Sequence, residues 1–438
     1  MKIINKNSDN FLSEFAKFLK NEGFIFQSNE IYGGVKGFYD FGPLGSLMKF
    51  NIKNLWLEDV VFKEKNIYLI ESSILNPEKT FQASGHLENF FDELVECSKC
   101  HFRFRVDEIE NEKCPECGAK DLMPPRKFNL MFETQIGPTG SQKGYLRPET
   151  AQGVFVNFLN VLNSTRAKLP FGIASIGKSF RNEINPRNFI FRLREFEQME
   201  LEFFVYPEES NKWFDYWVDK RYSWYIKLGI KKENLLKVEI PKSELPHYSQ
   251  RNIDLHYRFP FGFQEIEGIA NRSNYDLLRH SQFSGQDLVF WDEKKKEKII
   301  PYVIEPSAGV ERLMMAFLVD AFDVDEINGQ KRMVLRLHPK IAPIKVCILP
   351  LVTNRPQIVE MALKIYEELR LKFVCLYDDN GSIGRRYRRQ DEIGTPFCLT
   401  VDFESLVRND VTVRDRDSTL QERIHLKELE NFLKEKLK

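Results

Sequence analysis

The sequence lacks the features that mark a membrane protein, a secreted protein or a strongly charged one. Its 64 Lys and Arg residues balance 64 Asp and Glu residues, so the total charge identifies no partner, although a local basic region can still attract nucleic acid. No run of about 18 apolar residues occurs, and the N-terminal residues do not pair a charged segment with an apolar one. We therefore expect a cytoplasmic protein that has no membrane partner.

Cysteine is also scarce, and its distribution argues against disulfides. Four of the seven cysteines form two pairs, Cys97 with Cys100 and Cys114 with Cys117, separated by 13 residues. In a reducing compartment, two such pairs on tight turns are typical of a tetrahedral zinc site, with unmetallated thiols as the alternative. Four thiolates leave no coordination position for water, so we expect a structural Zn²⁺ rather than a catalytic one.

Length and proline positions predict how the chain is divided. A chain of 438 residues is too long for one core, and two or three domains are expected. Pro339 and Pro343 interrupt the pattern near residue 340, after which strand and helix alternate as in a compact α/β domain. We therefore expect an α+β domain over 1–340, with insertions at about 92–127 and about 207–246, and an α/β domain over 341–438.

Two helices are predicted near the N-terminus. Phe11, Phe15 and Phe18 recur at helical spacing and predict a helix over 11–21. Pro43 can open a second helix because the first turn of a helix needs no backbone donor there. Apolar residues then repeat every three or four positions over 44–60, which is wide enough to cover a core or a partner subunit.

Residues 181–200 carry side chains suited to a nucleotide. Phe180-Arg181-Asn182-Glu183 and the later Arg192-x-x-x-Phe196 fit a strand, a loop and a returning strand. A guanidinium can grip phosphate oxygens, an aromatic ring can stack on a purine, and a carboxylate can accept from an exocyclic amine. A surface hairpin with Arg and Glu paired across strands is the alternative for such a motif alone.

A second element lies at 306–312, directly before an apolar helix. Its small residues, Ser307, Ala308 and Gly309, let the backbone approach a ligand closely. Arg312 at the helix start can neutralise a terminal phosphate, while Glu311 braces the site. A helix cap with a solvated arginine is the alternative.

The Pro43 helix, the 181–200 hairpin and the Arg312 helix occur in the order of the three motifs of the class II aminoacyl-tRNA synthetases. The sequence resembles this family, and within it most of all the dimeric glycyl-tRNA synthetases. The further motifs that carry the resemblance span almost the whole chain and lie at 32–34, 83–86, 147–153, 189–200, 268–272, 305–307 and 382–387.

The resemblance implies a fold, an activity and partners. The expected fold is an α+β, antiparallel-sheet catalytic domain with a zinc-ribbon-like insertion and a C-terminal α/β anticodon-binding domain, assembled as a homodimer. The implied activity converts glycine and ATP, with Mg²⁺, to glycyl-adenylate, and transfers the glycyl group to the terminal adenosine of tRNA(Gly). No editing domain is expected because no smaller amino acid exists.

The resemblance also assigns residues, with Arg181 and Arg312 as the catalytic pair on the α- and γ-phosphates. The expected ATP-binding residues are Arg181, Asn182, Glu183, Phe191, Arg192, Leu193, Arg194, Glu195, Phe196, Glu265, Ile266, Gly309, Val310, Glu311 and Arg312. The expected glycine-binding residues are Arg105, Glu149, Phe196, Glu197, Gln198, Met199, Glu200, Arg272, Glu305, Pro306 and Ser307. Glu265 and Glu267 are candidate Mg²⁺ ligands, with strand-surface carboxylates as an equal alternative.

Glycine offers an ammonium, a carboxylate and no side chain. The resemblance implies that Glu149, Glu200 and Glu305 surround the ammonium, that Arg272 meets the carboxylate, and that Ser307 limits the space at the α-carbon. Admitting one more methyl group to a filled pocket costs roughly 1 to 3 kcal/mol, so packing can reject alanine by about 10- to 200-fold.

The C-terminal region contains a basic run that suits RNA. Basic charge beside an aromatic ring is what RNA loops require, and the resemblance places anticodon recognition here, with a solvated charge run as the alternative. The residues of the basic run are Arg385, Arg386, Tyr387, Arg388 and Arg389.

Two other functions stay open. One is a synthetase for another small amino acid. The other is a catalytically inactive nucleic-acid-binding relative, against which the three arginines 181, 192 and 312 argue.

Overall fold

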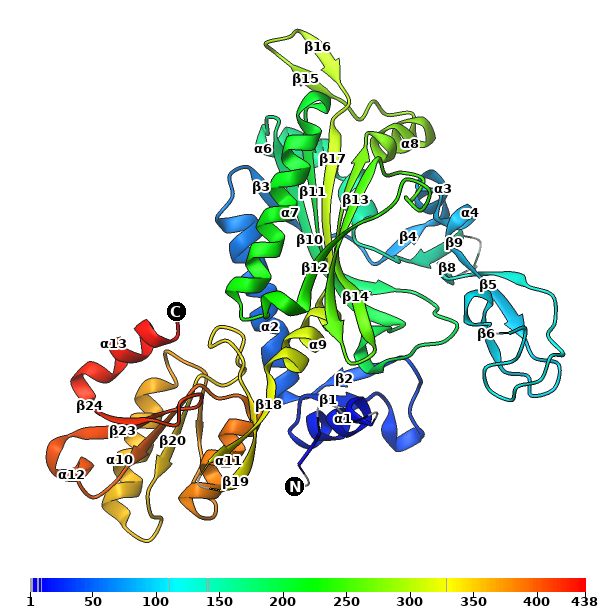
Figure 1. The fold of residues 1–438 in the computed structure, drawn as a ribbon. Helices are drawn as coiled ribbons and strands as arrows, with labels where there is room; N and C mark the ends of the chain where they lie inside the picture. The colour runs from blue at the N-terminus through cyan, green and yellow to red at the C-terminus, as the bar shows by residue number, and fades with distance from the viewer. Residues whose placement is uncertain are drawn as a thin grey trace.

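The computed structural model describes residues 3–5, 8, 10–109, 111–138, 140, 142–327 and 329–438. Figure 1 shows a large body built on a central sheet, with a second, smaller sheet-based body at the C-terminal end of the chain. Among the described residues, no helix combines the length and apolar character needed to cross a membrane.

The central sheet has seven strands in the order β12-β13-β14-β17-β11-β10-β3. Neighbouring strands are antiparallel except β10 and β3, which are parallel, so the expected antiparallel sheet is confirmed. The strands are β12 (Leu235–Glu239), β13 (Arg251–Phe259), β14 (Gly262–Ser273), β17 (Tyr302–Gly309), β11 (Glu195–Val205), β10 (Phe171–Phe180) and β3 (Ile67–Ile70).

Helices cover one face of this sheet and enclose the largest core. The helix α2 begins at Pro43, as its sequence predicted, and buries Met48, Ile52 and Trp56 at helical spacing. Its last turn passes into a π-helical turn, η2. The elements on this side are α1 (Phe11–Asn21), α2 (Pro43–Leu57), η2 (Glu58–Phe62), α7 (Ser210–Lys227) and α9 (Val310–Ala321).

The segment 207–246, which the sequence predicted to be a second insertion, contributes to this layer and to the edge of the sheet. It contains η5 (Pro207–Glu209), α7, η6 (Lys232–Asn234) and the sheet's edge strand β12. On α7, Phe214, Trp217 and Tyr225 are fully buried. Lys and Glu side chains on the outer side of the segment disguised this apolar face in the sequence.

The opposite face of the sheet is only partly covered. Three helices, α5 (Ala151–Val156), α6 (Phe158–Thr165) and α8 (Tyr275–Ser284), enclose a second core at one end of the sheet. A small sheet lies beside the uncovered part of the face. It is formed by β4 (Leu75–Pro77), β9 (Gln142–Leu146) and β8 (Phe132–Ile136), with the short helices α3 (Glu78–Ala83) and α4 (His86–Asn89).

Smaller elements extend from this body. The cysteine segment forms its own three-stranded sheet from β5 (Phe91–Glu96), β6 (Arg103–Arg105) and β7 (Arg126–Asn129), with η3 (Val106–Glu108), and it projects to one side in Figure 1. Two hairpins are formed by β1 (Ile25–Gln27) with β2 (Tyr39–Phe41) and by β15 (Phe290–Asp292) with β16 (Glu297–Ile299). Short helical turns lie at η1 (Glu30–Tyr32) and η4 (Phe189–Phe191).

The C-terminal body is a five-stranded sheet in the order β21-β20-β22-β23-β24. Its strands β20, β21 and β22 are parallel, as the alternation of strand and helix predicted. The strands are β20 (Val346–Pro350), β21 (Cys375–Tyr377), β22 (Phe397–Val401), β23 (Asp410–Asp415) and β24 (Gln421–His425), and the helices are α10 (Pro356–Leu369), α11 (Ile383–Ile393), α12 (Ser405–Arg408) and α13 (Leu426–Lys436).

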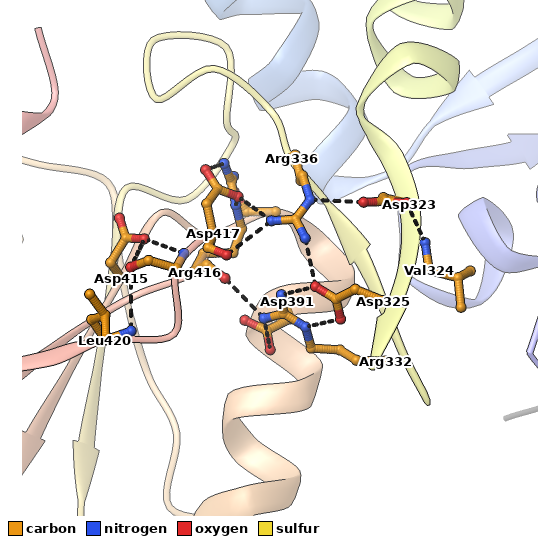
Figure 2. A network of polar contacts seen from close by, with 12 residues as sticks. Asp323, Val324, Asp325, Arg332, Arg336, Asp391, Asp415, Arg416, Asp417 and Leu420 are labelled. Atoms are coloured by element: carbon orange, nitrogen blue, oxygen red, sulfur yellow. Dashed lines mark hydrogen bonds and ion pairs between the residues drawn. The ribbon is translucent and has the colours of Figure 1, made fainter. Parts of the chain in front are cut away.

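A network of charged side chains joins the two bodies. The hairpin of β18 (Phe322–Ile327) and β19 (Gln330–Leu335) leaves the large body, and β19 packs along α11 (Figures 1 and 2). Buried Arg332 donates to Asp325 at 2.8 Å and to Asp391 of α11 at 3.1 Å. Arg336 reaches Asp417 at 3.2 Å, so carboxylates from both bodies share this hairpin's arginines.

Candidate active site

A cavity of about 320 Å³ opens on the part of the central sheet that α5, α6 and α8 leave uncovered. Its floor comes from strands β11, β14 and β17, with β13 at one side and the loop 181–194 at the other. The lining residues are Glu149, Arg181, Glu183, Ile190, Phe191, Arg192, Leu193, Phe196, Gln198, Glu200, Pro246, Tyr248, Asn252, Asp254, Glu265, Ile266, Gly268, Ala270, Glu305, Ser307, Gly309, Glu311 and Arg312.

Strand alternation decides which residues of β11 face the cavity. Successive side chains of a strand point to opposite faces, and Phe196, Gln198 and Glu200 line the cavity. Glu197 faces the helices instead, where its carboxylate lies 2.7 Å from both Lys49 and Lys53. The sequence predicted that consecutive residues of these strands bind the ligands, but only every second one lines the cavity. The residues that do not line it are Glu195, Glu197 and Met199 on β11 and Pro306 on β17.

Arg181 stands at the end of β10, at the entrance to the loop. Its guanidinium lies over the ring of Phe196, 5.3 Å from the ring centre, and its Nε donates to the carbonyl of Pro148 at 3.0 Å. Its guanidinium also lies 5.5 Å from the centre of the Phe90 ring, so one backbone contact and two rings orient it at the cavity wall. The pair thus combines a phosphate-binding group with an aromatic surface.

Arg312 lies on the first turn of α9, at the same end of the cavity as Phe191 and Glu265. Its Nη1 donates to the Glu265 carboxylate at 3.2 Å, and its guanidinium lies 4.4 Å from the centre of the Phe191 ring. Next to it, Glu311 accepts from Lys49 Nζ at 2.5 Å behind the sheet. The start of α9 is thereby tied to α2.

The loop 181–194 places some predicted residues in the cavity and turns others away. Glu183 accepts from Arg192 Nε at 2.6 Å, and both line the cavity. Arg194 instead donates to the carbonyls of Glu183 and Lys36, at 3.0 and 2.8 Å, and so holds the loop. Four predicted ATP-binding residues, Asn182, Arg194, Glu195 and Val310, are not in the cavity wall.

The other end of the cavity is acidic. Glu200 is almost fully buried and accepts from the Thr150 backbone N–H at 2.7 Å, from Ser307 Oγ at 2.7 Å and from Gln198 Nε2 at 3.0 Å. Burial, followed by the neighbouring charge of Glu149, raises the pKa of Glu200. This end is built to receive a positive group.

Glu305 completes the acidic end. Burial raises the pKa of Glu305 to about 8; Arg272 opposes this rise, and the carboxylates of Glu200 and Glu149 add to it. Arg272 donates to Glu305 at 2.6 Å and to Asp276 at 2.8 Å. It is 2% exposed, and its guanidinium lies 3.9 Å from the centre of the ring of Tyr248, which lines the cavity. Its contact with the ligand stays a prediction.

Arg105 is linked to the cavity through Asp92. Its Nε donates to Asp107 at 2.9 Å, and its Nη1 lies 3.4 Å from Asp92. Asp92 in turn lies 3.7 Å from Arg192 of the cavity wall, and a direct contact of Arg105 with the ligand stays a prediction.

Two carboxylates beside Arg312 suit a divalent cation. Asp254 on β13 and Glu265 on β14 both line the cavity, and burial, followed by the charge of Glu265, raises the pKa of Asp254 to about 7. Glu267 does not belong there: it is fully buried behind the sheet, where it accepts from Arg221 at 2.7 Å and Tyr225 at 2.5 Å. The prediction that Glu267 is a candidate Mg²⁺ ligand is therefore wrong.

Sequence reasoning missed several wall residues. Asn252 and Asp254 alternate along β13, and Gly268 and Ala270 pair with this strand from β14. Their alternation with apolar residues was visible, but which strand lies beside β14 was not. The missed residues are Ile190, Pro246, Tyr248, Asn252, Asp254, Gly268 and Ala270.

The four cysteines converge at the projecting module. Their sulfur atoms all lie within 4.8 Å of one another, with Cys97 Sγ 3.7 Å from Cys117 Sγ and Cys100 Sγ 3.7 Å from Cys114 Sγ. Thiols gathered this closely, without disulfide bonds, match the donor set of a tetrahedral zinc site.

The basic run on α11 is largely occupied within its own domain. Arg386 is buried and donates to the carbonyl of Pro350 at 2.5 Å, while Arg389 donates to Asp378 at 2.7 Å. Tyr387 shares a 2.6 Å hydrogen bond with Thr400 Oγ1. Arg386 is therefore not accessible to RNA, which corrects the prediction for this residue. Arg385 and Arg388, in contrast, are exposed.

The fold and the cavity define a class II aminoacyl-tRNA synthetase. The family models described as "tRNA synthetase class II core domain (G, H, P, S and T)" and "Anticodon binding domain" match residues 135–321 and 345–436. A solved structure of Giardia lamblia prolyl-tRNA synthetase in complex with prolyl-adenylate has the same fold, with a TM-score of 0.71, 19% identity, and coverage of 99% of this chain and 80% of that one.

Curated relatives narrow the class. The glycine–tRNA ligase of Caldanaerobacter subterraneus subsp. tengcongensis is 49% identical, with 98% of each chain covered. Those of Bifidobacterium longum and Thermobifida fusca are both 48% identical, covering 96% and 97% of this chain and 92% and 98% of theirs. This chain belongs to the glycine–tRNA ligase family.

Proposed function

We propose that this protein ligates glycine to tRNA(Gly) at the expense of ATP. One observation carries the proposal: a single cavity joins an arginine and aromatic end, containing Arg181, Phe196 and Arg312, to an end with three glutamates, of which two are buried and one is half-buried. A polyanion and a cation of small size can therefore meet in one enclosed space. Those are the charges of ATP and of the amino end of glycine.

At the arginine end, ATP would bind with its adenine on Phe196, its α-phosphate at Arg181 and its γ-phosphate at Arg312. A glycine carboxylate oxygen attacks the α-phosphorus, the bond to the bridging oxygen breaks, and pyrophosphate leaves. Glycyl-adenylate then loses AMP as a ribose hydroxyl of the terminal tRNA adenosine attacks the glycyl carbonyl. Fixed positive charge and positioning lower the barrier for the first step.

Mg²⁺ fits the same end. Asp254 and Glu265 would hold it, because two neighbouring carboxylates that repel one another gain most from a cation between them. The ion supplies charge neutralisation on the phosphates. Arg181 and Arg312 orient the phosphate chain from their own sides of the cavity.

At the acidic end, Glu149, Glu200 and Glu305 would surround the glycine ammonium. Arg272 limits the net negative charge from behind, and Ser307, held by Glu200, closes the space at the α-carbon. A methyl group there would have no room, so we expect alanine to be rejected by about 10- to 200-fold through packing alone.

Assembly and tRNA binding extend the proposal. We infer a homodimer formed around α2, since Phe50 on α2 and Phe62 on η2 are 59% and 71% exposed, an apolar character that a partner subunit would cover. The C-terminal domain would contact the anticodon region of the tRNA. Zn²⁺ bound by the four cysteines would shape the cysteine module. The reaction would take place in the cytoplasm.

Pyrophosphate exchange with each of the twenty amino acids tests the proposal. We expect glycine to drive exchange and alanine to drive it far more weakly. Exchange driven best by another amino acid would identify a different synthetase. A preparation that binds ATP but exchanges with none of the twenty would indicate an accessory nucleic-acid-binding protein.

A further inference from the structure

The motif at 83–86 lies outside the cavity wall, at the turn between α3 and α4. Gly85 adopts φ = +81°, and a Cβ at this position would lie 3.2 Å from Asn89 Nδ2. Glycine is therefore required for the turn. The consequence is that α4 starts at His86, directly behind the acidic end of the cavity.

His86 is half-buried, with 12% of its side chain exposed. Its Nδ1 lies 2.7 Å from Ser84 Oγ, and its Nε2 lies 3.4 Å from Oε2 of Glu149. Its ring packs edge-on against Phe81 and Phe90, with ring centres 5.9 and 5.5 Å away. Ser84 is 4% exposed and the side chains of His86 and Glu149 are each 12% exposed, so solvent is largely kept from the chain of contacts between them.

Glu149 needs such support more than an exposed carboxylate would. Burial opposes the ionisation of Glu149. The charge of His86, its hydrogen bond to Glu149 and the charge of Arg272 outweigh burial, so the pKa of Glu149 lies below its usual range. Its other oxygen, Oε1, accepts from Gln152 Nε2 at 2.9 Å. Gln152 Oε1 lies 2.8 Å from His280 Nε2, which defines the direction of the amide.

We propose that His86 is a positioning residue of the glycine pocket, whose Nε2–H holds the carboxylate of Glu149 ionised and directed at the substrate ammonium. This inference rests on the proposed function. Because the Ser84 hydroxyl can donate to Nδ1 of a neutral ring or accept from Nδ1–H of a charged one, Nε2 carries the proton that faces Glu149 in both states. Hydrogen bonding of one ring nitrogen thereby sets the role of the other.

Glu200, across the acidic end, is braced differently. Its carboxylate accepts from the Thr150 backbone N–H and from Ser307. Of these two opposed carboxylates, Glu149 is the one that faces a histidine, and Arg181 and Arg312 lie at the other end of the cavity. Loss of His86 should therefore weaken glycine binding and leave ATP binding nearly unchanged.

Three variants test this inference by pyrophosphate exchange. H86F keeps the edge-on packing against Phe81 and Phe90 but removes both nitrogens, and we expect the KM for glycine to rise by about 10-fold or more while the KM for ATP changes less than about twofold. H86Q places an amide N–H where Nε2 lies and should restore the glycine KM to within about threefold of the wild type. H86N reaches only the position of Nδ1, near Ser84, and should behave like H86F.

An unchanged glycine KM in H86F, or equal losses in H86Q and H86N, would overturn the inference. If H86F does not fold, as judged by circular dichroism, the difference between H86Q and H86N decides. Combining H86F with E149Q provides a further criterion, since a residue that acts through Glu149 must give a non-additive double mutant. Failure of the proposed function is distinguishable, because the wild-type protein would then show no glycine-driven exchange.

Discussion

The two ends of the cavity achieve recognition by different means. At the arginine end, the guanidinium groups of Arg181 and Arg312 are ionised at any physiological pH, and backbone carbonyls and rings orient them, as Pro148 and Phe196 do for Arg181. At the acidic end, buried carboxylates repel one another, and burial raises the pKa of Glu305 to about 8. A pocket for an anion can thus be charged in advance, whereas this pocket for a cation acquires part of its charge when the ligand arrives.

The largest expected effect is at the arginine end. R181A should lower the pyrophosphate exchange rate by about 100- to 1000-fold, because a preorganised positive group next to the reacting phosphate would be missing. R181K should recover only part of the rate, since an ammonium cannot form the same fork of hydrogen bonds. Thermal melting serves as the control for folding, and an R181A rate close to the wild type would refute the assignment.

A smaller loss is expected at the acidic end. E200Q keeps the shape of the side chain but removes its charge, so the KM for glycine should rise by about 10- to 100-fold while the KM for ATP stays within about twofold. Steady-state exchange at varied glycine and varied ATP separates the two. A parallel rise in both constants would mean that the two ends do not act independently.

The pH dependence should separate the two ends further. Because burial raises the pKa of Glu305 to about 8 from its usual value of 4.5, Glu305 is largely protonated at neutral pH in the free protein. Glycine binding favours its ionised form, so the KM for glycine should fall as the pH rises from about 6 to 8, with the KM for ATP changing less. Between pH 4.5 and about pH 8, Glu305 binds its proton more strongly in the folded state than in the unfolded state. Its contribution to the free energy of unfolding therefore declines as the pH rises through this range.

Exchange assays across this pH range measure both constants on one preparation. A glycine KM that is flat from pH 6 to 8 would show that Glu305 does not titrate with the ligand. Wild-type melting curves at the same pH values control for unfolding.

The smallest effect is expected outside the cavity, on α11. R385A, at an exposed position, should weaken tRNA binding by about two- to threefold and reduce its salt dependence, with no change in stability. R386A removes donors from buried carbonyls instead and should lower the free energy of unfolding by about 1 to 3 kcal/mol. Filter binding and urea unfolding of the two variants test whether the basic run is divided between RNA and the domain interior.

Much of the architecture was predictable because it depends on local patterns. The helix expected over 11–21 is α1, and the second helix begins at Pro43. Helical spacing of phenylalanines and the tolerance of a first helical turn for proline are properties of neighbouring residues. The close approach of the four cysteines likewise follows from two short turns that each bring a pair together.

Other features could not be predicted because they depend on which segments pack together. Glu265 and Glu267 are two positions apart, yet a bulge in β14 opposite Leu255 and His256 leaves Glu265 at the cavity and Glu267 behind the sheet. The charged outer side of α7 similarly concealed a face that packs in the main core.

The sequence by itself determined the class of the protein, the order of its motifs and the kinds of chemistry that its arginines, glutamates and cysteines can perform. Only the tertiary structure decided which of these side chains share a cavity. In a strand every second residue faces away, so Glu197 supports α2 while Gln198 lines the site. Distance along the chain carries no information about that choice, because it is made by the elements that pack on each face of the sheet.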